Sequence, residues 1–311
     1  MGSSTDGHAF APASSSPIGW ECPISDQEFR LFQELVKAHT GIDLSEHKRS
    51  LVASRLGRRL RALSLPSFRS YYGFLNGDSG QEELENFINA ITTNKTDFYR
   101  EPLHFDFLGN DFLPALKARA ARNGERRIRI WSAGCSTGEE PYTIAITLRE
   151  GIENLLTWDI RILASDIDTQ VLAQAAQGIY PAERIAEIPR PILQRYFLRG
   201  VGSQAGLVQV AREVQRLVTF RRINLQEEPW PIRTAFDCIF CRNVIIYFDK
   251  PTQRRLTDRF ADYLKDDGYL FLGHSESLYG VSNRFGFLRN TIYRKMGARG
   301  APPSQTMGAS A

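Results

Sequence analysis

The segment that most constrains the fold of this chain is residues 127–142, where an apolar run breaks into a glycine-bearing turn that opens a helix. Ile128 and Ile130 predict a buried strand, while Gly134 and Gly138 allow the backbone to turn and approach a ligand. A strand, a glycine turn and a helix in this order are typical of α/β sheets that hold a nucleotide-shaped cofactor. The segment therefore predicts an α/β fold with a cofactor site at this turn.

Acidic residues near this turn indicate which cofactor it suits. A Walker-type phosphate loop has Lys and then Ser or Thr after its last glycine, but this chain has Glu139 and Glu140. Two carboxylates at a helix N-terminus repel a pyrophosphate, whereas they suit hydroxyl groups, an ammonium group or a sulfonium cation. The next apolar run ends at Asp166, where such folds place a ribose-binding acid. These residues predict S-adenosylmethionine rather than ATP or NAD. Capping of the following helix is the alternative for Asp166 and the favoured role for Asp168.

Length and composition set further limits. A chain of 311 residues exceeds one average domain, so we expect a large α/β domain and a smaller appendage. No apolar run approaches the roughly 20 residues of a membrane helix, and the N-terminus lacks the pattern of a signal peptide. The four cysteines show no disulfide spacing, which agrees with a reducing compartment. We therefore expect a cytoplasmic protein without direct membrane insertion.

Cys238 and Cys241 nominally match a metal-binding pair. They lie in an apolar run that predicts a strand, in which positions i and i+3 face opposite sides of the sheet. Shared metal binding is then disfavoured, and no metal site is expected.

Changes of pattern divide the chain into parts. Residues 1–24 and 297–311 have little to bury, and we expect disordered tails. Residues 25–90 predict a helical N-terminal domain, which opens with a capping box from Ser25 to Glu28. From 91 to 296 strands and helices alternate, which favours a doubly wound domain with a mostly parallel sheet. We expect strands at 127–132, 160–165, 218–222, 236–241 and 269–273, with weaker ones near 286 and 292.

Residues 179–217 interrupt this alternation. They contain short proline-bounded helices and then two apolar runs, around Phe197 and at 207–210, joined by a Gly-rich turn. We expect a small antiparallel sheet inserted in the large domain, with an open strand edge at these two runs. An open edge can accept a peptide as an added strand.

Two further segments should meet the cofactor turn at the carboxyl ends of the strands. Asn224 and Leu225 follow the third strand and can contact an adenine, although an Asn that closes a loop turn is an equal alternative. Arg242 and Asn243 follow the fourth strand without the prolines common in enzymes that methylate amide or adenine nitrogens, which disfavours a nucleobase as the acceptor. Ahead of the sheet, Arg100 can clamp a carboxylate, or it is a surface residue of a capped linker.

Five ordered motifs together resemble the chemotaxis receptor methyltransferases, the CheR family, over residues 25–296. The motifs are Asn94-Lys-Thr-Asp-Phe-Tyr-Arg100, Trp131-Ser-Ala-Gly-Cys-Ser-Thr-Gly-Glu-Glu-Pro-Tyr142, Ala164-Ser-Asp-Ile-Asp168, Phe240-Cys-Arg-Asn-Val-Ile-Ile-Tyr-Phe-Asp249 and Gly273-His-Ser-Glu-Ser277. The resemblance implies a helical N-terminal domain, a methyltransferase domain and an inserted β-subdomain. It also implies S-adenosylmethionine as methyl donor, S-adenosylhomocysteine as product, and glutamate side chains of chemoreceptors as acceptors.

The resemblance assigns roles residue by residue. Tyr247 corresponds to the family's aromatic hydroxyl near the transferred methyl. We expect Arg100 and Tyr247 to orient the ligand carboxylates and the reacting methyl. Which of the two contacts the acceptor is left open. The cofactor site that the resemblance implies consists of Asn94, Thr96, Arg100, Glu140, Asp166, Asn224, Leu225, Arg242 and Asn243.

A basic helix indicates how a partner is recognised. The chain has a net charge of only +4, yet basic residues cluster at 47–61, and Lys48, Arg55 and Arg59 share one helical stripe. Such a stripe is often a solvated face, but acidic receptor helices are a natural partner for it. We expect a monomer that binds chemoreceptor helices and, through the insert, their C-terminal tail peptide, with no nucleic-acid partner. The alternatives are an RNA or small-molecule methyltransferase, a docking module without methyl transfer, and a dehydrogenase.

Overall fold

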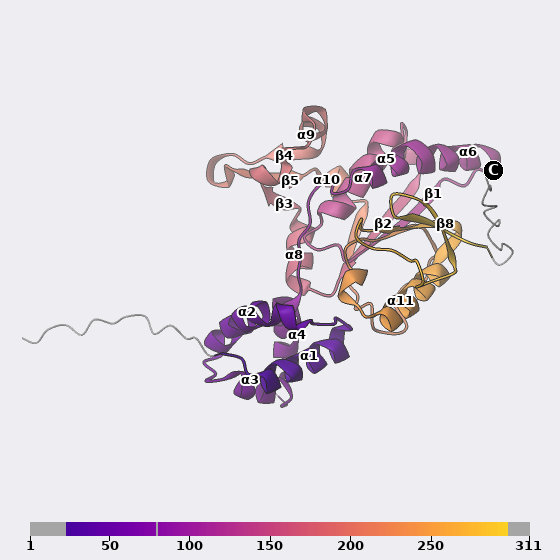
Figure 1. Cartoon of the computed structure of the whole chain (residues 1–311). Coiled ribbons are helices and arrows are strands. Elements are labelled where there is room, and N and C mark those ends of the chain that lie inside the picture. The colour runs from indigo at the N-terminus through magenta and orange to yellow at the C-terminus, as the bar shows by residue number, and fades with distance from the viewer. Residues whose placement is uncertain (1–22, 79, 298–311) are drawn as a thin grey trace, which may run out of the picture.

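The computed structural model describes residues 23–78 and 80–297. Figure 1 shows a helical domain beside a larger α/β domain, from which a small β-insert projects. The disordered tails expected at 1–24 and 297–311 fall almost wholly outside the described residues. No helix within the described ranges is long and apolar enough to cross a membrane.

Four helices and one 3-10 turn build the N-terminal domain around an aromatic core. The first helix begins with the predicted capping box, since Ser25 and Glu28 each accept from the other's backbone N–H, and it ends at Gly41 in the left-handed region (φ 72°). Phe32 packs against Tyr71 and Phe87, all of them buried. The elements are α1 (Asp26–Thr40), η1 (Glu46–Lys48), α2 (Arg49–Ala62), α3 (Phe68–Leu75) and α4 (Gly80–Ile91).

A seven-stranded sheet forms the centre of the large domain. Its order is β6-β2-β1-β7-β8-β10-β9; the first five strands are parallel, and β10 pairs antiparallel with both β8 and β9. The doubly wound α/β class and every predicted strand position are confirmed, although β8 begins five residues earlier than residue 269. The strands are β1 (Arg127–Ala133), β2 (Asp159–Asp166), β6 (Val218–Arg222), β7 (Phe236–Cys241), β8 (Leu264–Leu272), β9 (Phe285–Arg289) and β10 (Ile292–Lys295).

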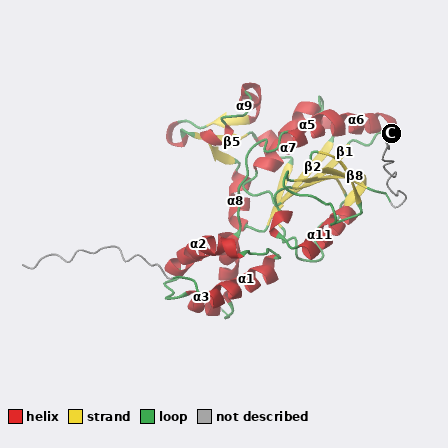
Figure 2. Cartoon of the chain, viewed as in Figure 1, coloured by secondary structure: helices red, strands yellow, loops and turns green. Residues whose placement is uncertain are grey.

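Helices cover both faces of this sheet, as Figure 2 shows. On one face, α5 (Leu103–Phe107), α6 (Leu113–Asn123) and α7 (Glu139–Gly151) contribute to the larger apolar core, and on the other α11 (Lys250–Tyr263) contributes to a second. Alternate residues of β7 point into the two cores, so Cys238 belongs to the first and Cys241 to the second. The expectation that these cysteines face opposite sides is confirmed.

The insert contains a three-stranded antiparallel sheet in the order β3-β5-β4. The predicted hairpin is confirmed by β4 and β5, but β3 is a strand that no sequence pattern indicated. The central strand is therefore β5, and the expectation of an open edge at 207–210 is wrong, because the edges belong to β3 and β4. The elements from α8 onward are α8 (Thr169–Gln177), β3 (Ile179–Pro181), η4 (Ala182–Ile185), α9 (Arg190–Tyr196), β4 (Phe197–Arg199), η5 (Gly202–Gln204), β5 (Leu207–Val210) and α10 (Arg212–Gln215).

Candidate functional site

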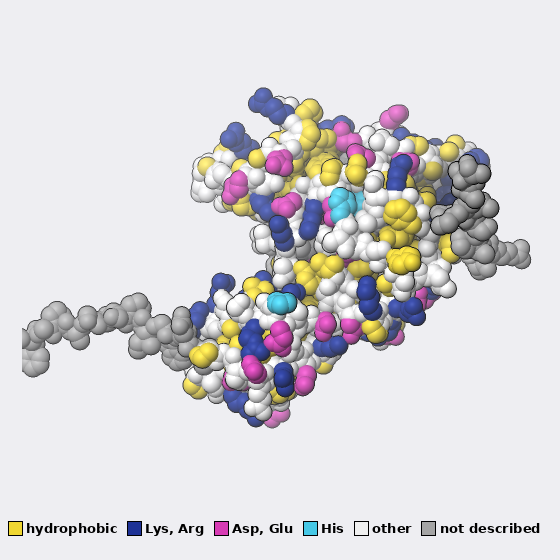
Figure 3. All heavy atoms as spheres, in the orientation of Figure 1, with side chains coloured by type: hydrophobic (Ala, Val, Ile, Leu, Met, Phe, Trp, Pro, Cys, Tyr) yellow, Lys and Arg dark blue, Asp and Glu magenta, His cyan; other side chains and the backbone are white. Residues whose placement is uncertain are grey.

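A cavity of about 280 Å³ lies where the helical domain meets the carboxyl ends of the parallel strands. Figure 3 shows the surface hollowed between the helical domain and the insert, with Lys and Arg side chains beside the hollow. Tyr247, Lys48 and Arg55 line the cavity, whereas Arg59 does not. All nine residues that the resemblance placed at the cofactor also line it: Asn94, Thr96, Arg100, Glu140, Asp166, Asn224, Leu225, Arg242 and Asn243.

Asp166 stands at the end of β2 beside the glycine turn. Its two carboxylate oxygens accept the backbone N–H of Ser136 at 2.8 Å and of Asp168 at 3.0 Å. Burial raises its pKa to about 6, although these backbone donors oppose the shift. Asp168 instead caps α8 by accepting from the backbone N–H of Gln170 and Val171, which confirms its capping role. Asp166 lines the cavity with lone pairs still available to a ligand hydroxyl.

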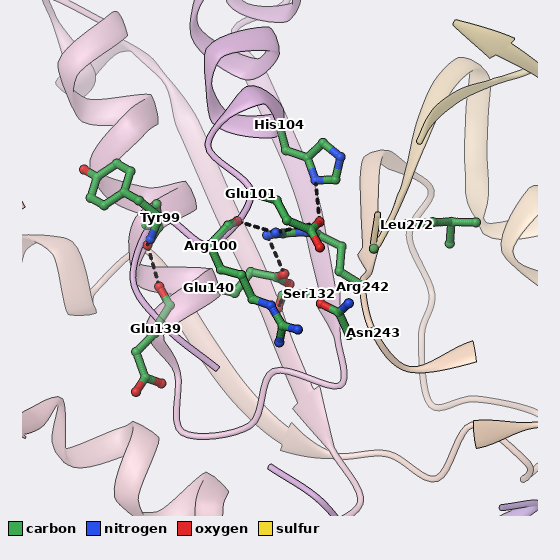
Figure 4. A network of polar contacts seen from close by, with 12 residues as sticks. Tyr99, Arg100, Glu101, His104, Ser132, Glu139, Glu140, Arg242, Asn243 and Leu272 are labelled. Carbon is green, nitrogen blue, oxygen red and sulfur yellow. Dashed lines mark hydrogen bonds and ion pairs between the residues drawn. The ribbon is translucent and has the colours of Figure 1, made fainter. Parts of the chain in front are cut away.

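A buried arginine organises the floor of the cavity (Figure 4). Arg242 has a side chain only 2% exposed and lies between two carboxylates, Glu101 at 3.0 Å and Glu140 at 3.1 Å. Burial raises the pKa of Glu140 above its usual value. Burial acts in the same sense on Glu101, but the backbone N–H of His274 and the Arg242 guanidinium outweigh it and lower the pKa. Arg242 is therefore a fixed cation that orients Glu140 toward the site.

Arg100 offers donors to a ligand. Its backbone carbonyl accepts from Arg242, and its Nη1 donates to the carbonyl of Lys95 at 2.8 Å. Figure 4 shows its guanidinium directed away from the Arg242 ion pairs. No other hydrogen bond of this guanidinium is present among the described residues, and Arg100 lines the cavity, so donors remain available to a ligand. The neighbours Tyr99 and Glu101 have positive φ angles of 54° and 59°, which shows that the loop is held in a sparsely populated conformation.

The loop after β7 is shaped by Glu276, a residue to which no sequence pattern assigned a role. Its carboxylate accepts the backbone N–H of Gly273 at 2.6 Å, of Asn243 at 2.8 Å and of Ile246 at 3.2 Å. Glu276 is 4% exposed, and burial raises its pKa. Its position in the fifth motif was the available signal. The loop it holds presents Tyr247, whose ring lies 4.7 Å from the Lys48 ammonium.

Two amides that the resemblance placed at the cofactor hold the protein's own backbone or side chains. Asn224 donates to the carbonyl of His39 at 2.7 Å and accepts the backbone N–H of Gln226 at 3.0 Å, which supports the turn-closing alternative. Asn94 donates to the Asp168 carboxylate at 2.7 Å. Both side chains therefore shape the cavity wall and have little capacity left to donate to an adenine.

The three basic residues of the α2 stripe have different surroundings. Lys48 lies over Tyr247 at the cavity. Arg55 also lines the cavity and donates to the carbonyls of Ile91 and Thr92, at the end of α4, at 2.8 and 2.7 Å. Arg59 faces away from the cavity and forms a two-pronged ion pair with Glu83, a carboxylate 5% exposed.

Three side chains with metal-ligating atoms, Glu101, His104 and His274, lie within 4.8 Å of one another. Burial lowers the pKa of His104 to about 4, so its ring is neutral, and its Nε2 is 2.6 Å from the carbonyl of Asn290. Arg242 donates to the same Glu101 oxygen that faces His104. The charge of that guanidinium opposes a cation at this place.

A doubly wound sheet with an acid after β2, a carboxylate at the N-terminus of α7 and a cavity at the strand ends is typical of an enzyme that binds a nucleoside-containing cofactor. Comparison with known families specifies it further. The family model described as the CheR methyltransferase SAM binding domain matches residues 94–294, and that of the CheR methyltransferase all-alpha domain matches 27–92. The chain belongs to the CheR methyltransferase family, and its cofactor is S-adenosylmethionine, as predicted.

Chemotaxis protein methyltransferases from several bacteria are similar in sequence to most of this chain. Chemotaxis protein methyltransferase 2 of Pseudomonas aeruginosa is 47% identical over 86% of this chain and 92% of its own length. The chemotaxis protein methyltransferase of Salmonella typhimurium is 44% identical over 87% and 90%, and that of Escherichia coli 42% identical over 87% and 91%. The dehydrogenase alternative is excluded by the family, and the RNA or small-molecule alternative is not favoured.

Proposed function

We propose that this protein transfers the methyl group of S-adenosylmethionine to glutamate side chains on the cytoplasmic part of chemoreceptors and forms glutamate methyl esters. The observation that best supports a carboxylate acceptor is the charge around Tyr247. Lys48, Arg55 and Arg100 all line the same cavity as this tyrosine. Three cations at one cavity favour an anionic acceptor over a neutral amine or hydroxyl.

The chemistry needs positioning more than proton transfer. A glutamate side chain has a reference pKa of about 4.3 and is an ionised nucleophile at neutral pH, so no general base is required. S-adenosylmethionine supplies an electrophilic methyl: its carbon–sulfur bond breaks as a carbon–oxygen bond forms, and the negative carboxylate and positive sulfonium both become neutral. Arg100 and Tyr247 would hold the acceptor oxygen in line at a near-attack distance of roughly 3 to 3.5 Å. Glu140 and Asp166 would hold polar groups of the cofactor.

Docking of the receptor would use two surfaces. Lys48 and Arg55 lie at the cavity and can meet acidic side chains that flank the acceptor. Arg59 belongs to the same helix, but its pairing with Glu83 leaves it less able to bind a partner. The open β4 edge of the insert would capture the receptor's C-terminal tail as an added strand and raise the local enzyme concentration. We propose that the enzyme works as a monomer in the cytoplasm.

The decisive experiment is incubation with labelled S-adenosylmethionine and receptor cytoplasmic fragments, followed by mapping of base-labile methyl esters. We expect label on specific glutamates, and none on fragments in which those glutamates are replaced by glutamine. Arg100→Met should lower the rate and leave the fold intact. Label on RNA, or cofactor binding without label on any receptor fragment, would contradict the proposed acceptor.

A further inference from the structure

The β-insert contacts both loops that form the cofactor cavity. One loop, residues 94–100, contributes Asn94, Thr96, Asp97 and Arg100 to the cavity wall. The other is the glycine turn between β1 and α7, which contributes Gly134 and Ser136 and leads into Glu140. An element expected to serve only receptor docking is thus in contact with the site of methyl transfer.

A single side chain of the insert joins the two loops. Arg184, in η4, donates from Nη2 to the carbonyl of Thr96 and to Oε1 of Glu139, each at 2.6 Å, and from Nη1 to the carboxylate of Asp97 at 3.0 Å. Glu139 is only 1% exposed, and its other oxygen accepts from the Thr137 hydroxyl at 2.6 Å. Glu139 therefore faces the insert and not the cofactor, unlike its neighbour Glu140.

Aromatic packing strengthens the same connection. Phe98, in the first loop, packs edge-on against Tyr180 at 5.0 Å and Phe197 at 5.4 Å between ring centroids, and both partners belong to strands of the insert. The hydroxyl of Tyr180 donates to the carbonyl of Thr137 in the second loop at 2.7 Å. The insert thus holds both loops by buried contacts and not by a flexible tether.

We propose that the insert is part of the cofactor-binding machinery and that Arg184 is a positioning residue, which fixes the spacing of the 94–100 loop and the glycine turn around S-adenosylmethionine. A guanidinium suits this task because its rigid fork can reach three acceptors at once, whereas a lysine ammonium is a point donor on a flexible stem. The inference concerns cofactor affinity, so it stays testable even if the acceptor in the proposed function is wrong.

The test must separate positioning from simple neutralisation of a buried charge. Arg184→Met strands the Glu139 carboxylate, which destabilises a protein whatever the role of the arginine. The double variant Glu139→Gln with Arg184→Met removes that stranded charge and leaves Thr96 and Asp97 without their donor. Arg184→Lys keeps a positive charge beside Glu139. Arg190→Met is the matched control, because Arg190 is an exposed arginine of the insert whose side chain forms no hydrogen bond or ion pair within the described residues.

The measurements are the dissociation constant for S-adenosylhomocysteine by calorimetry, the KM for S-adenosylmethionine, and the unfolding midpoint without ligand. We expect the double variant and Arg184→Lys to unfold near the wild-type midpoint yet to bind about tenfold or more weakly, the equivalent of one lost charge-assisted hydrogen bond. Arg190→Met should bind as the wild type does. Wild-type affinity in the double variant would overturn the proposal, because Arg184 would then only neutralise Glu139.

Discussion

The Asp166 carboxylate is buried, although its proposed role at the cofactor requires the ionised form. Its carboxylate is 8% exposed and accepts two backbone N–H groups of the protein, yet burial still raises its pKa to about 6. By linkage, the raised pKa stabilises the ligand-free fold below the unfolded value near 3.8, and this contribution is lost as the pH rises through about 6. A carboxylate kept ionised at neutral pH in such a place is typical of a binding site and not of a structural cap.

Replacement of Asp166 by alanine should weaken binding of S-adenosylmethionine by roughly 1.5 to 3 kcal/mol, the value of hydrogen bonds to a charged group. Wild-type affinity should also fall as the pH drops from 8 to 5, because protonation near pH 6 removes the charged acceptor. Calorimetry across this pH range measures both effects, and the alanine variant should show the weaker pH dependence. Unchanged affinity in a folded variant would reduce Asp166 to a residue that holds the loop.

Substitutions of Arg59 and of its neighbour Arg58 test whether Arg59 stabilises the fold while Arg58 is only a surface residue of α2. Arg59→Ala leaves the Glu83 carboxylate, 5% exposed, with only the Tyr71 hydroxyl at 2.7 Å and the Asn86 amide at 3.1 Å as donors. We expect a loss of about 2 to 3 kcal/mol in the free energy of unfolding, measured by urea denaturation. Arg58→Ala, at an exposed position, should change it by no more than about 0.5 kcal/mol. Equal effects would show that the Glu83 ion pair contributes nothing.

At the scale of elements, α2 provides a test of receptor docking. Reversing the charge of Arg59 would destabilise the helical domain, because it would place a carboxylate beside the buried Glu83. Arg58→Glu is the better probe, since Arg58 is exposed and interacts electrostatically with Arg55. The KM for receptor fragments should rise, cofactor affinity should stay unchanged, and the effect should shrink with added salt. Arg30→Glu on α1 is the control, with the same change in charge at another exposed site. Equal effects of the two variants would indicate nonspecific attraction only.

The insert edge that can accept a peptide is β4. The backbone N–H of Gly200 donates to the carbonyl of Leu207, and the carbonyl of Tyr196 accepts from the N–H of Ala211. The backbone N–H and C=O groups of even-numbered residues in β4 therefore point toward β5, and those of odd-numbered residues point toward the open edge. The opposite edge, β3, ends in Pro181, which lacks an N–H. The exposed side chain of Leu198 (57%) adds apolar surface beside the open edge.

Arg199→Pro should therefore abolish binding of receptor tail peptides and spare cofactor binding, because it removes an outward donor and no ladder bond. Calorimetry with tail peptides and with S-adenosylhomocysteine measures both. A proline at Val208 is the matched contrast, since Val208 is a buried residue of the central strand and its replacement should unfold the insert. No binding of tail peptides to the wild-type protein would leave the insert with its role at the cofactor site alone.

Elements whose formation depends on local pattern could be predicted from the sequence. The bounds of β6 and β7 equal the predicted ranges, and the capping box places the start of α1. Three-residue β3 has no such signal, because it forms only by pairing with β5, and Pro181 indicates a turn. The early start of β8 is hidden by its charged residues Lys265 and Asp266. The sequence also predicted that the site residues meet at one edge of the sheet. It could not predict the hydrogen-bond partners of Glu139, Asn224 or Glu276, because each partner is distant along the chain.

For the whole molecule, the cavity exists because two domains meet. The backbone of Asp43 donates to the carbonyl of Tyr247 at 2.7 Å, and Ile42 forms an isolated bridge with Phe248. Farther along the contact, Asn89 of α4 exchanges hydrogen bonds with Thr169, the first residue of α8. The helical domain is thus bonded to the loops that carry the site, and its α2 forms one wall of the cavity.

Binding of S-adenosylhomocysteine should therefore slow amide hydrogen exchange in both domains. Residues 40–52 and 91–100 should become protected together with 134–140 and 223–225, because all four segments line the cavity and opening any wall would expose the ligand. Helix α3 (Phe68–Leu75), which contributes no residue to the lining, is the internal control and should exchange at the same rate with and without ligand. Mass spectrometry of the exchanged full-length protein measures each segment. Protection confined to residues beyond 94 would mean that the helical domain moves away from the bound cofactor, and that Lys48 and Arg55 do not share a site with it.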